Sequence, residues 1–407
     1  MKKKNNKIDR RDFLKTVGAA GLGSVLTPAN AKGDPNADGK TEETKFPQVP
    51  KRKLGKTGVE VPVLALGMIF NVADRQIVLR KALEWGITYW DTAHGYTGGN
   101  SELGIGKFLG KNPEVRKRLF LVSKASGAET PTDIESRLQT SLKRMSTKYI
   151  DLYYGVHGLE DPAQLTDELK NWAESAKKRK LIRFFGFSTH ENMAKCLTAA
   201  AKAGWVDAIM TTYNFRVMQD EKMQAAVEAC YKAGVGLVAM KTQAQEVKTE
   251  EDKRLTEHFL KRGFTEGQAK TKAVLEDKRI SSACTSRGNL AHLLENVAAV
   301  LDKTKLTQAD MELFKQYAKD TCSGYCAGCS NICGPAAPEV PHINNVMRYL
   351  MYYNSYGERQ DARELFAKIP QDARDKLLSA DYSLAEARCP QHLPIGKLMA
   401  EAVSKLA

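Results

Sequence analysis

The chain has 407 residues, 42% of them hydrophobic, and a formal net charge of +14 at pH 7. This length exceeds one average domain and suits a large domain with a smaller second module. Residues 1–31 contain seven basic and two acidic side chains, so part of the charge is local. The rest is spread along amphipathic segments with no basic run interleaved with aromatic residues, so we expect no nucleic-acid partner.

The N-terminus has the pattern of a sorting signal. Lysines precede Arg10-Arg11, a short apolar stretch runs from Thr16 to Leu26, and Ala29-Asn30-Ala31 supplies small residues. The stretch is too short to span a bilayer, which needs about 20 residues. It resembles a twin-arginine signal peptide over 1–31, cleaved after Ala31, with a flexible linker over 32–50. We expect the export machinery as a partner, a periplasmic location and no integral membrane segment; a disordered basic tail is the alternative.

Short apolar runs alternate with helix-like segments between about residues 60 and 302. Apolar strands separated by helices imply a parallel sheet, and eight such units favour an α/β fold of the closed (β/α)8 or TIM-barrel type, which we place over 51–304. No Gly-x-Gly-x-x-Gly follows the first strand, which argues against a Rossmann sheet. The expected strands are Val63–Ile69, Thr88–Ala93, Leu119–Lys124, Ile150–Val156, Arg183–Ser188, Ala208–Tyr213, Gly236–Lys241 and Ile280–Thr285.

Four polar side chains come at or just after the ends of three successive predicted strands. Asp91 and Tyr96 follow the second strand, Lys124 ends the third and His157 ends the fourth. Taken singly, each has an ordinary structural interpretation, as a packed tyrosine, a solvated lysine or a structural histidine. The C-terminal strand ends of such barrels meet at one mouth, so we expect the four side chains to converge there.

The run Trp90-Asp91-Thr92-Ala93-x-x-Tyr96, with Gly99-Asn100-Ser101-Glu102 opening a helix, resembles the signature of the aldo-keto reductases. Leu54–Val59 is similar to the hairpin below the barrel in that family. The resemblance covers about residues 52 to 302 and implies reversible NADP- or NAD-dependent redox of a small-molecule carbonyl or alcohol. It implies that Tyr96 is the proton donor, that Lys124 lowers the tyrosine pKa, that Asp91 holds Lys124, and that His157 orients the carbonyl.

The nucleotide site that this resemblance implies is matched in part. Thr189 follows Ser188 where the family has a Ser-Asn pair, and Met240 stands where it often has an aromatic residue. Arg287 could pair with a 2′-phosphate, which favours NADP over NAD; an ordinary helix cap is the alternative. The candidate cofactor-binding residues are Gly67, Met68, Ser188, Thr189, Tyr213, Met240, Thr285, Ser286, Arg287, Glu295 and Asn296.

Five of the eight cysteines follow residue 320. Cys326, Cys329 and Cys333 have the Cys-x2-Cys-x3-Cys spacing, and with the remote Cys389-Pro390 they form a ferredoxin-like ligand set for one 4Fe-4S cluster. The tail resembles the ferredoxin-like extension of some aldo-keto reductases, so we assign 305–407 to a small C-terminal helical iron–sulfur module. Structural zinc, disulfides, or Cys322 as a ligand in place of Cys333 or Cys389 are the alternatives.

Two functions stay open at this point. One is an exported oxidoreductase whose cluster is structural or passes electrons to a redox partner protein. NADPH is not expected to circulate outside the cytoplasm, so the other is a non-turnover electron-transfer or ligand-binding protein built on the same barrel.

Overall fold

The computed structural model of the protein describes residues 46–244, 250–285, 288–340, 342–356 and 358–407. The predicted signal peptide and most of the predicted linker lie outside these residues. Within them, no helix combines the length and the apolar character that a membrane crossing requires.

A short antiparallel hairpin precedes the barrel. Strand β1 (Lys51–Lys53) pairs with β2 (Glu60–Pro62), and the buried side chains of Leu54 and Val61 join the cluster inside the barrel. Gly55 has a φ of +50°, and a Cβ there would lie 2.3 Å from the carbonyl oxygen of Gly234. Only glycine allows this approach without strain, so the hairpin packs directly on the chain that enters the seventh barrel strand.

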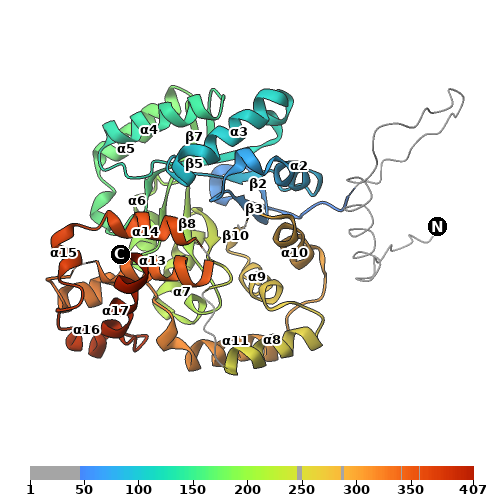
Figure 1. Cartoon of the computed structure of the whole chain (residues 1–407). Helices are drawn as coiled ribbons and strands as arrows, with labels where there is room; N and C mark the ends of the chain where they lie inside the picture. The colour runs from blue at the N-terminus through green and yellow to red at the C-terminus, as the bar shows by residue number, and fades with distance from the viewer. Residues whose placement is uncertain (1–45, 245–249, 286–287, 341, 357) are drawn as a thin grey trace, which may run out of the picture. The chain divides into compact units, whose positions relative to one another are not determined.

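Eight parallel strands close into a barrel in chain order, and β10 pairs with both β9 and β3 (Figure 1). The predicted (β/α)8 barrel is therefore confirmed, with strand ends shifted by one or two residues. Alternate side chains point inward, and Tyr89, Leu152 and Met210 belong to the interior cluster. The strands are β3 (Leu64–Gly67), β4 (Tyr89–Asp91), β5 (Phe120–Lys124), β6 (Ile150–His157), β7 (Ile182–Thr189), β8 (Ala208–Thr212), β9 (Gly236–Met240) and β10 (Ile280–Thr285).

The helices that follow the strands pack on their outer faces (Figure 1). Several begin at a capping side chain; Thr130, for example, accepts from the Asp133 amide while Asp133 bonds back to Thr130. The barrel helices are α2 (Gln76–Glu84), α3 (Asn100–Lys111), α4 (Pro131–Arg144), α5 (Asp167–Lys178), α6 (Met193–Ala203), α7 (Glu221–Lys232), α8 (Glu250–Lys261), α9 (Glu266–Glu276) and α10 (Leu290–Leu301).

The chain after α10 first packs on the barrel. Helix α11 (Gln308–Asp320) buries Phe314 against Phe259, with ring centroids 4.8 Å apart, in the layer between strands and helices. The separate C-terminal core therefore begins after α11, later than the predicted boundary at residue 305. Its helices are α12 (Ser330–Cys333), α13 (Ile343–Met351), α14 (Arg359–Ala367), α15 (Gln371–Asp375), α16 (Ser383–Arg388) and α17 (Ile395–Leu406).

Candidate active site and cysteine pocket

The four predicted catalytic residues lie together at the C-terminal ends of β4, β5 and β6. The fully buried Lys124 places its Nζ 2.5 Å from Asp91 Oδ1 and 3.3 Å from the Tyr96 hydroxyl. The Tyr96 and His157 rings meet edge to face, with centroids 5.8 Å apart. Parallel pairing brings neighbouring strand ends level with one another, which is why residues distant in sequence share one site.

A hydroxyl group orients His157. Ser126 Oγ lies 2.9 Å from His157 Nδ1 and accepts the Gly95 amide at 3.1 Å. The Ser126 hydrogen can therefore point to Nδ1, which leaves the proton of a neutral imidazole on Nε2, free to donate elsewhere. Ser126 is absent from the predicted site, although its place two residues after Lys124 is a signal that could have found it.

Burial sets the protonation states at this site. It raises the pKa of Tyr96 to about 12, although Lys124 opposes that shift. Lys124 lowers this pKa as expected, but the desolvation of the phenolate has a larger effect, so the pKa rises overall. Burial also lowers the pKa of Lys124, but Asp91 and Tyr96 outweigh it and raise that pKa overall. Burial, Lys124 and Arg348 lower the pKa of His157 to about 3, so phenol and imidazole are both neutral donors.

Side chains of the Gly99–Glu102 run form hydrogen bonds to the strand ends that carry the site. Ser101 Oγ donates to the Met68 carbonyl at 2.7 Å and lies 2.7 Å from Thr92 Oγ1. Glu102 is fully buried, and its Oε1 accepts from Ser123 Oγ at 2.6 Å. These bonds tie the start of α3 to the ends of three strands, so they hold the backbone that carries Asp91 and Lys124.

Three of the predicted cofactor-binding positions face the barrel interior. Gly67 lies on the same strand face as Ala65, Ser188 on the same face as Phe184, and Met240 packs against the interior cluster. The Ser188 hydroxyl is buried and has no hydrogen-bond partner among the described residues. A buried hydroxyl without a partner is costly unless a ligand satisfies it, and this one fits the carboxamide of a nicotinamide.

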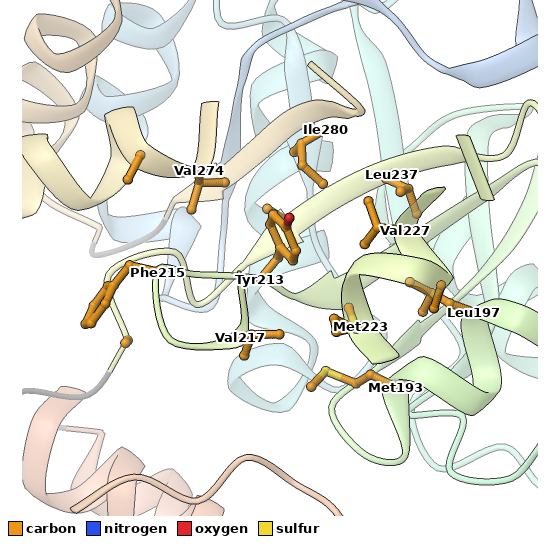
Figure 2. Close-up of a cluster of buried hydrophobic side chains, with 14 of the residues drawn as sticks. Met193, Leu197, Tyr213, Phe215, Val217, Met223, Val227, Leu237, Val274 and Ile280 are labelled. Carbon is orange, nitrogen blue, oxygen red and sulfur yellow. The ribbon is translucent and has the colours of Figure 1, made fainter. Parts of the chain in front are cut away.

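Three other predicted cofactor-binding residues are engaged elsewhere. The Thr189 hydroxyl lies 2.7 Å from the Leu159 carbonyl oxygen, and the Glu295 carboxylate accepts from Thr265. Tyr213 donates to Asp277 at 2.6 Å, and its ring sits among the outer-layer side chains shown in Figure 2. Side chains alternate along a strand, so Thr212 faces the mouth and Tyr213 faces the helices, contrary to the prediction for Tyr213.

The remaining predicted cofactor-binding residues divide into three groups. Met68 is buried, and only its main chain takes part in the bonds described above. Thr285 ends β10, and Asn296 is buried on α10. Ser286 and Arg287 lie outside the described residues, so the predicted phosphate contact stays a prediction.

The four predicted cluster ligands line one pocket in the C-terminal core. Cys326, Cys329 and Cys333 come from the segment that ends in α12, and Cys389 follows α16. Cys322 does not line this pocket. All eight cysteines are free thiols in the structure. The other lining side chains are mainly apolar and comprise Ala327, Ile332, Ile343, Pro390, Gln391, Leu393 and Ile395.

The cysteine spacing bears on which metal group the pocket suits. Among the described residues, no three His, Cys, Asp or Glu side chains are grouped as ligands of a single ion. Structural zinc needs four thiolates around one ion, each about 2.3 Å from it. A four-iron cluster takes its thiolates at separate irons, so they stand further apart around a larger group. The four thiols that line the pocket are the donor type that a four-iron cluster takes.

A second cavity lies where the C-terminal core meets the barrel mouth. His190, Thr212 and Lys241 line it from the ends of β7, β8 and β9, and Arg348 lines it from α13. Gly328, with a φ of +77°, brings the cysteine segment there; a Cβ at this position would lie 2.2 Å from the His190 carbonyl oxygen. No sequence pattern indicated that α13 reaches the mouth, because the docking depends on this tertiary contact.

A closed parallel barrel with a buried lysine–aspartate pair, a tyrosine and a histidine at its mouth defines a class of carbonyl reductases. The model of the aldo/keto reductase family matches residues 69–319. The chain belongs to this family, which is one of oxidoreductases. The C-terminal core lies beyond the matched residues.

Relatives whose names state an activity or a cofactor align with parts of the chain. An aldo-keto reductase of Schizosaccharomyces pombe, named yakc [NADP(+)], is 30% identical over 213 residues, covering 47% of this chain and 60% of that protein. The L-glyceraldehyde 3-phosphate reductase of Escherichia coli O157:H7 is 23% identical, covering 65% and 91%. The chain spans about half to two thirds of the length of several curated relatives that it matches.

Solved structures agree with the fold. The holo form of an aldo-keto reductase from Bacillus halodurans superposes with a TM-score of 0.56 at 22% identity, covering 66% of this chain and 96% of that one. A thermostable aldo-keto reductase named Tm1743 gives the same TM-score at 28% identity and is covered completely.

We predict that His157 stays uncharged from pH 8 to pH 5. Its pKa in the folded chain, about 3, lies below the ordinary 6.5. As the pH falls, the His157 imidazole is therefore protonated in the unfolded chain before it is protonated in the folded chain. Between pH 6.5 and pH 3 this difference increasingly destabilises the fold, and above pH 6.5 it has no such effect. The measurement is an NMR titration of labelled histidine rings, assigned by the signal lost in His157→Gln. A His157 signal that titrates near 6.5 would contradict the prediction.

Proposed function

We propose that the protein is an oxidoreductase that interconverts a small-molecule carbonyl compound and its alcohol with NADP(H) or NAD(H). The observation that carries this proposal is the buried Lys124, which is paired with Asp91 and has its Nζ 3.3 Å from the Tyr96 hydroxyl at a barrel mouth. Family membership, and the NADP(+) in the name of the Schizosaccharomyces pombe relative, support the cofactor class.

The chain's own residues handle the proton and the oxygen. Tyr96 is protonated at neutral pH and donates its proton to the carbonyl oxygen, while Lys124 stabilises the phenolate that forms. Asp91 keeps Lys124 charged in its buried place. The Nε2–H of His157 donates a hydrogen bond to the same oxygen as negative charge develops there. Ser188 and Met240 are the residues at the mouth that would hold a nicotinamide cofactor, which would supply the hydride.

Replacing Tyr96 by phenylalanine should lower kcat/KM for carbonyl reduction by about 10²–10⁴-fold, because the proton donor is lost while the ring remains. The measurement is anaerobic NADPH and NADH oxidation by the mature protein against a panel of aldehydes, ketones and quinones. Tyr231→Phe is the matched control, since Tyr231 is 56% exposed on α7. Wild-type protein that neither turns over nor binds nicotinamide nucleotide would refute the enzyme proposal.

We also propose that Cys326, Cys329, Cys333 and Cys389 hold one 4Fe-4S cluster, which supplies one-electron redox chemistry when bound. Their shared, mostly apolar pocket supports this proposal. Cys326 and Ala327 line both this pocket and the mouth cavity, so the two sites adjoin. The same contact favours the second candidate function, a barrel that passes electrons to a partner protein or holds a small molecule without turnover.

Anaerobically purified protein should contain about four irons and four sulfides per chain and be brown. Cys326→Ser should lose iron and colour, because it removes one of the four thiolates. Cys322→Ser is the matched control and should keep both, since Cys322 stands outside the pocket. Iron content and the visible spectrum are the readouts. Zinc in place of iron, or loss of iron in the Cys322 variant alone, would overturn the proposed ligand set.

The N-terminal pattern is the basis for proposing periplasmic export by the twin-arginine route. A cluster assembled in the reducing cytoplasm suits a route that carries folded proteins. The double change Arg10→Lys, Arg11→Lys should leave the uncleaved chain in the cytoplasm, while Lys2→Gln with Lys3→Gln should still be exported. Cell fractionation and N-terminal sequencing are the measurements, and a mature chain should begin at Lys32. Export that survives loss of both arginines would count against this route.

A further inference from the structure

We propose that Lys241 and Arg348 form an anion-binding subsite in the mouth cavity, and that the substrate is a carbonyl compound carrying an anionic oxygen group such as a carboxylate. This inference rests on the proposed function, because it names the substrate class of that same mouth. The subsite needs both parts of the chain, since Lys241 follows β9 and Arg348 comes from α13.

The charges in this cavity are unbalanced. Lys241 and Arg348 line it together with His190, and no aspartate or glutamate is among its lining residues. Lys241 forms no ion pair with the described residues, and its Nζ lies 5.1 Å from the centre of the Tyr352 ring. Arg348 donates to Asn345 Oδ1 at 2.5 Å, a neutral acceptor. Two cations thus share a partly enclosed space without a carboxylate between them.

One carboxylate acts on the cavity from its edge. Glu191 contributes to the electrostatic environment of Arg348, but its Oε2 already accepts from the amide of Asn344. Burial and the repulsion of Arg348 lower the pKa of Lys241, whereas Tyr352, Tyr349 and Glu191 outweigh burial and raise the pKa of Arg348. An anion bound between Lys241 and Arg348 would offset both the burial of the Lys241 ammonium group and its repulsion by Arg348, because it would pair with two donors that water hydrates poorly here.

The subsite lies next to the reacting groups. His157 pairs with Ser188 at the end of β7, and His190, which lines the cavity, follows Ser188 by two residues. A substrate whose oxygen meets Tyr96 and His157 can therefore place an anionic group at Lys241 and Arg348. Fixing both ends of the substrate would orient its carbonyl for reduction.

The proposed cysteine-bound cluster offers a second explanation for the positive charge of Lys241 and Arg348. Cys326 lines the same cavity, and its thiolate would interact favourably with Lys241. In that case the two cations would compensate the charge of the cluster rather than bind substrate. The two roles make different predictions, since only the substrate role discriminates between charged and neutral ligands.

The test compares two ligands of the same shape, 4-acetylbenzoate and the neutral 4-acetylbenzamide, by anaerobic isothermal titration calorimetry on the mature holoprotein. We expect wild type to bind the carboxylate at least about 10-fold more tightly than the amide, as charge-assisted hydrogen bonds imply. Lys241→Met and Arg348→Met should each abolish most of this preference and leave amide binding little changed. Lys202→Met is the control, because Lys202 is exposed on α6, and it should keep the preference.

Each outcome decides the proposal. Equal affinities in wild type, or a preference that survives both variants, would overturn the subsite. Loss of iron or a changed visible spectrum in the variants, with carboxylate preference intact, would assign the two cations to the cluster and also overturn it. Charge-selective binding without any turnover would keep the subsite and reject the proposed enzyme activity, so the two failures are distinguishable.

Discussion

Closure of the parallel barrel is the constraint on which the other features depend. Pairing of β10 with β3 removes the free edges of the sheet and brings all strand ends to one mouth. Lys124, Asp91 and His157 come from different strands, and they meet only because the register sets neighbouring ends level. The hairpin at the other end completes the enclosure, with Leu54 and Val61 packed into the interior.

Enclosure then determines the chemistry of the mouth. Lys124 is 1% exposed and stays charged because Asp91, with a smaller contribution from Tyr96, outweighs the effect of burial, and the same low-polarity setting keeps Tyr96 and His157 neutral. A neutral phenol beside a fixed ammonium group is suited to give up its proton as an oxyanion forms. The hydroxyl of Ser126 and the main chain of Gly95 orient the imidazole, so the donors are arranged before a substrate arrives.

The C-terminal core adds a feature that lies beyond the family match. Its cysteine segment packs against the end of β7 through Gly328 and Asn192, whose amide donates to the Gly328 carbonyl oxygen at 3.0 Å. The docking places α13 over one side of the mouth and makes Cys326 common to two cavities. The cysteine-lined pocket and the reductase-like mouth are thereby held next to each other. Two separate domains joined by a flexible linker would not keep them at a fixed distance.

The sequence by itself determined the eight strands, the barrel class and the four residues at the mouth. These follow from local apolar runs and from a rule about strand ends, so they need no knowledge of the packing between distant segments. It also grouped the four cysteines, from the local Cys-x2-Cys-x3-Cys spacing and from the resemblance of the remote Cys389-Pro390 segment to a ferredoxin-like tail. Only the tertiary structure decided that Tyr213 turns towards the helices, that α11 belongs to the barrel layer, and that Lys241 and Arg348 share a cavity. Each of these depends on strand facing or on contacts between remote segments. The burial that the tertiary structure creates disfavours the charged forms, so it raises the pKa of Tyr96 and lowers that of His157.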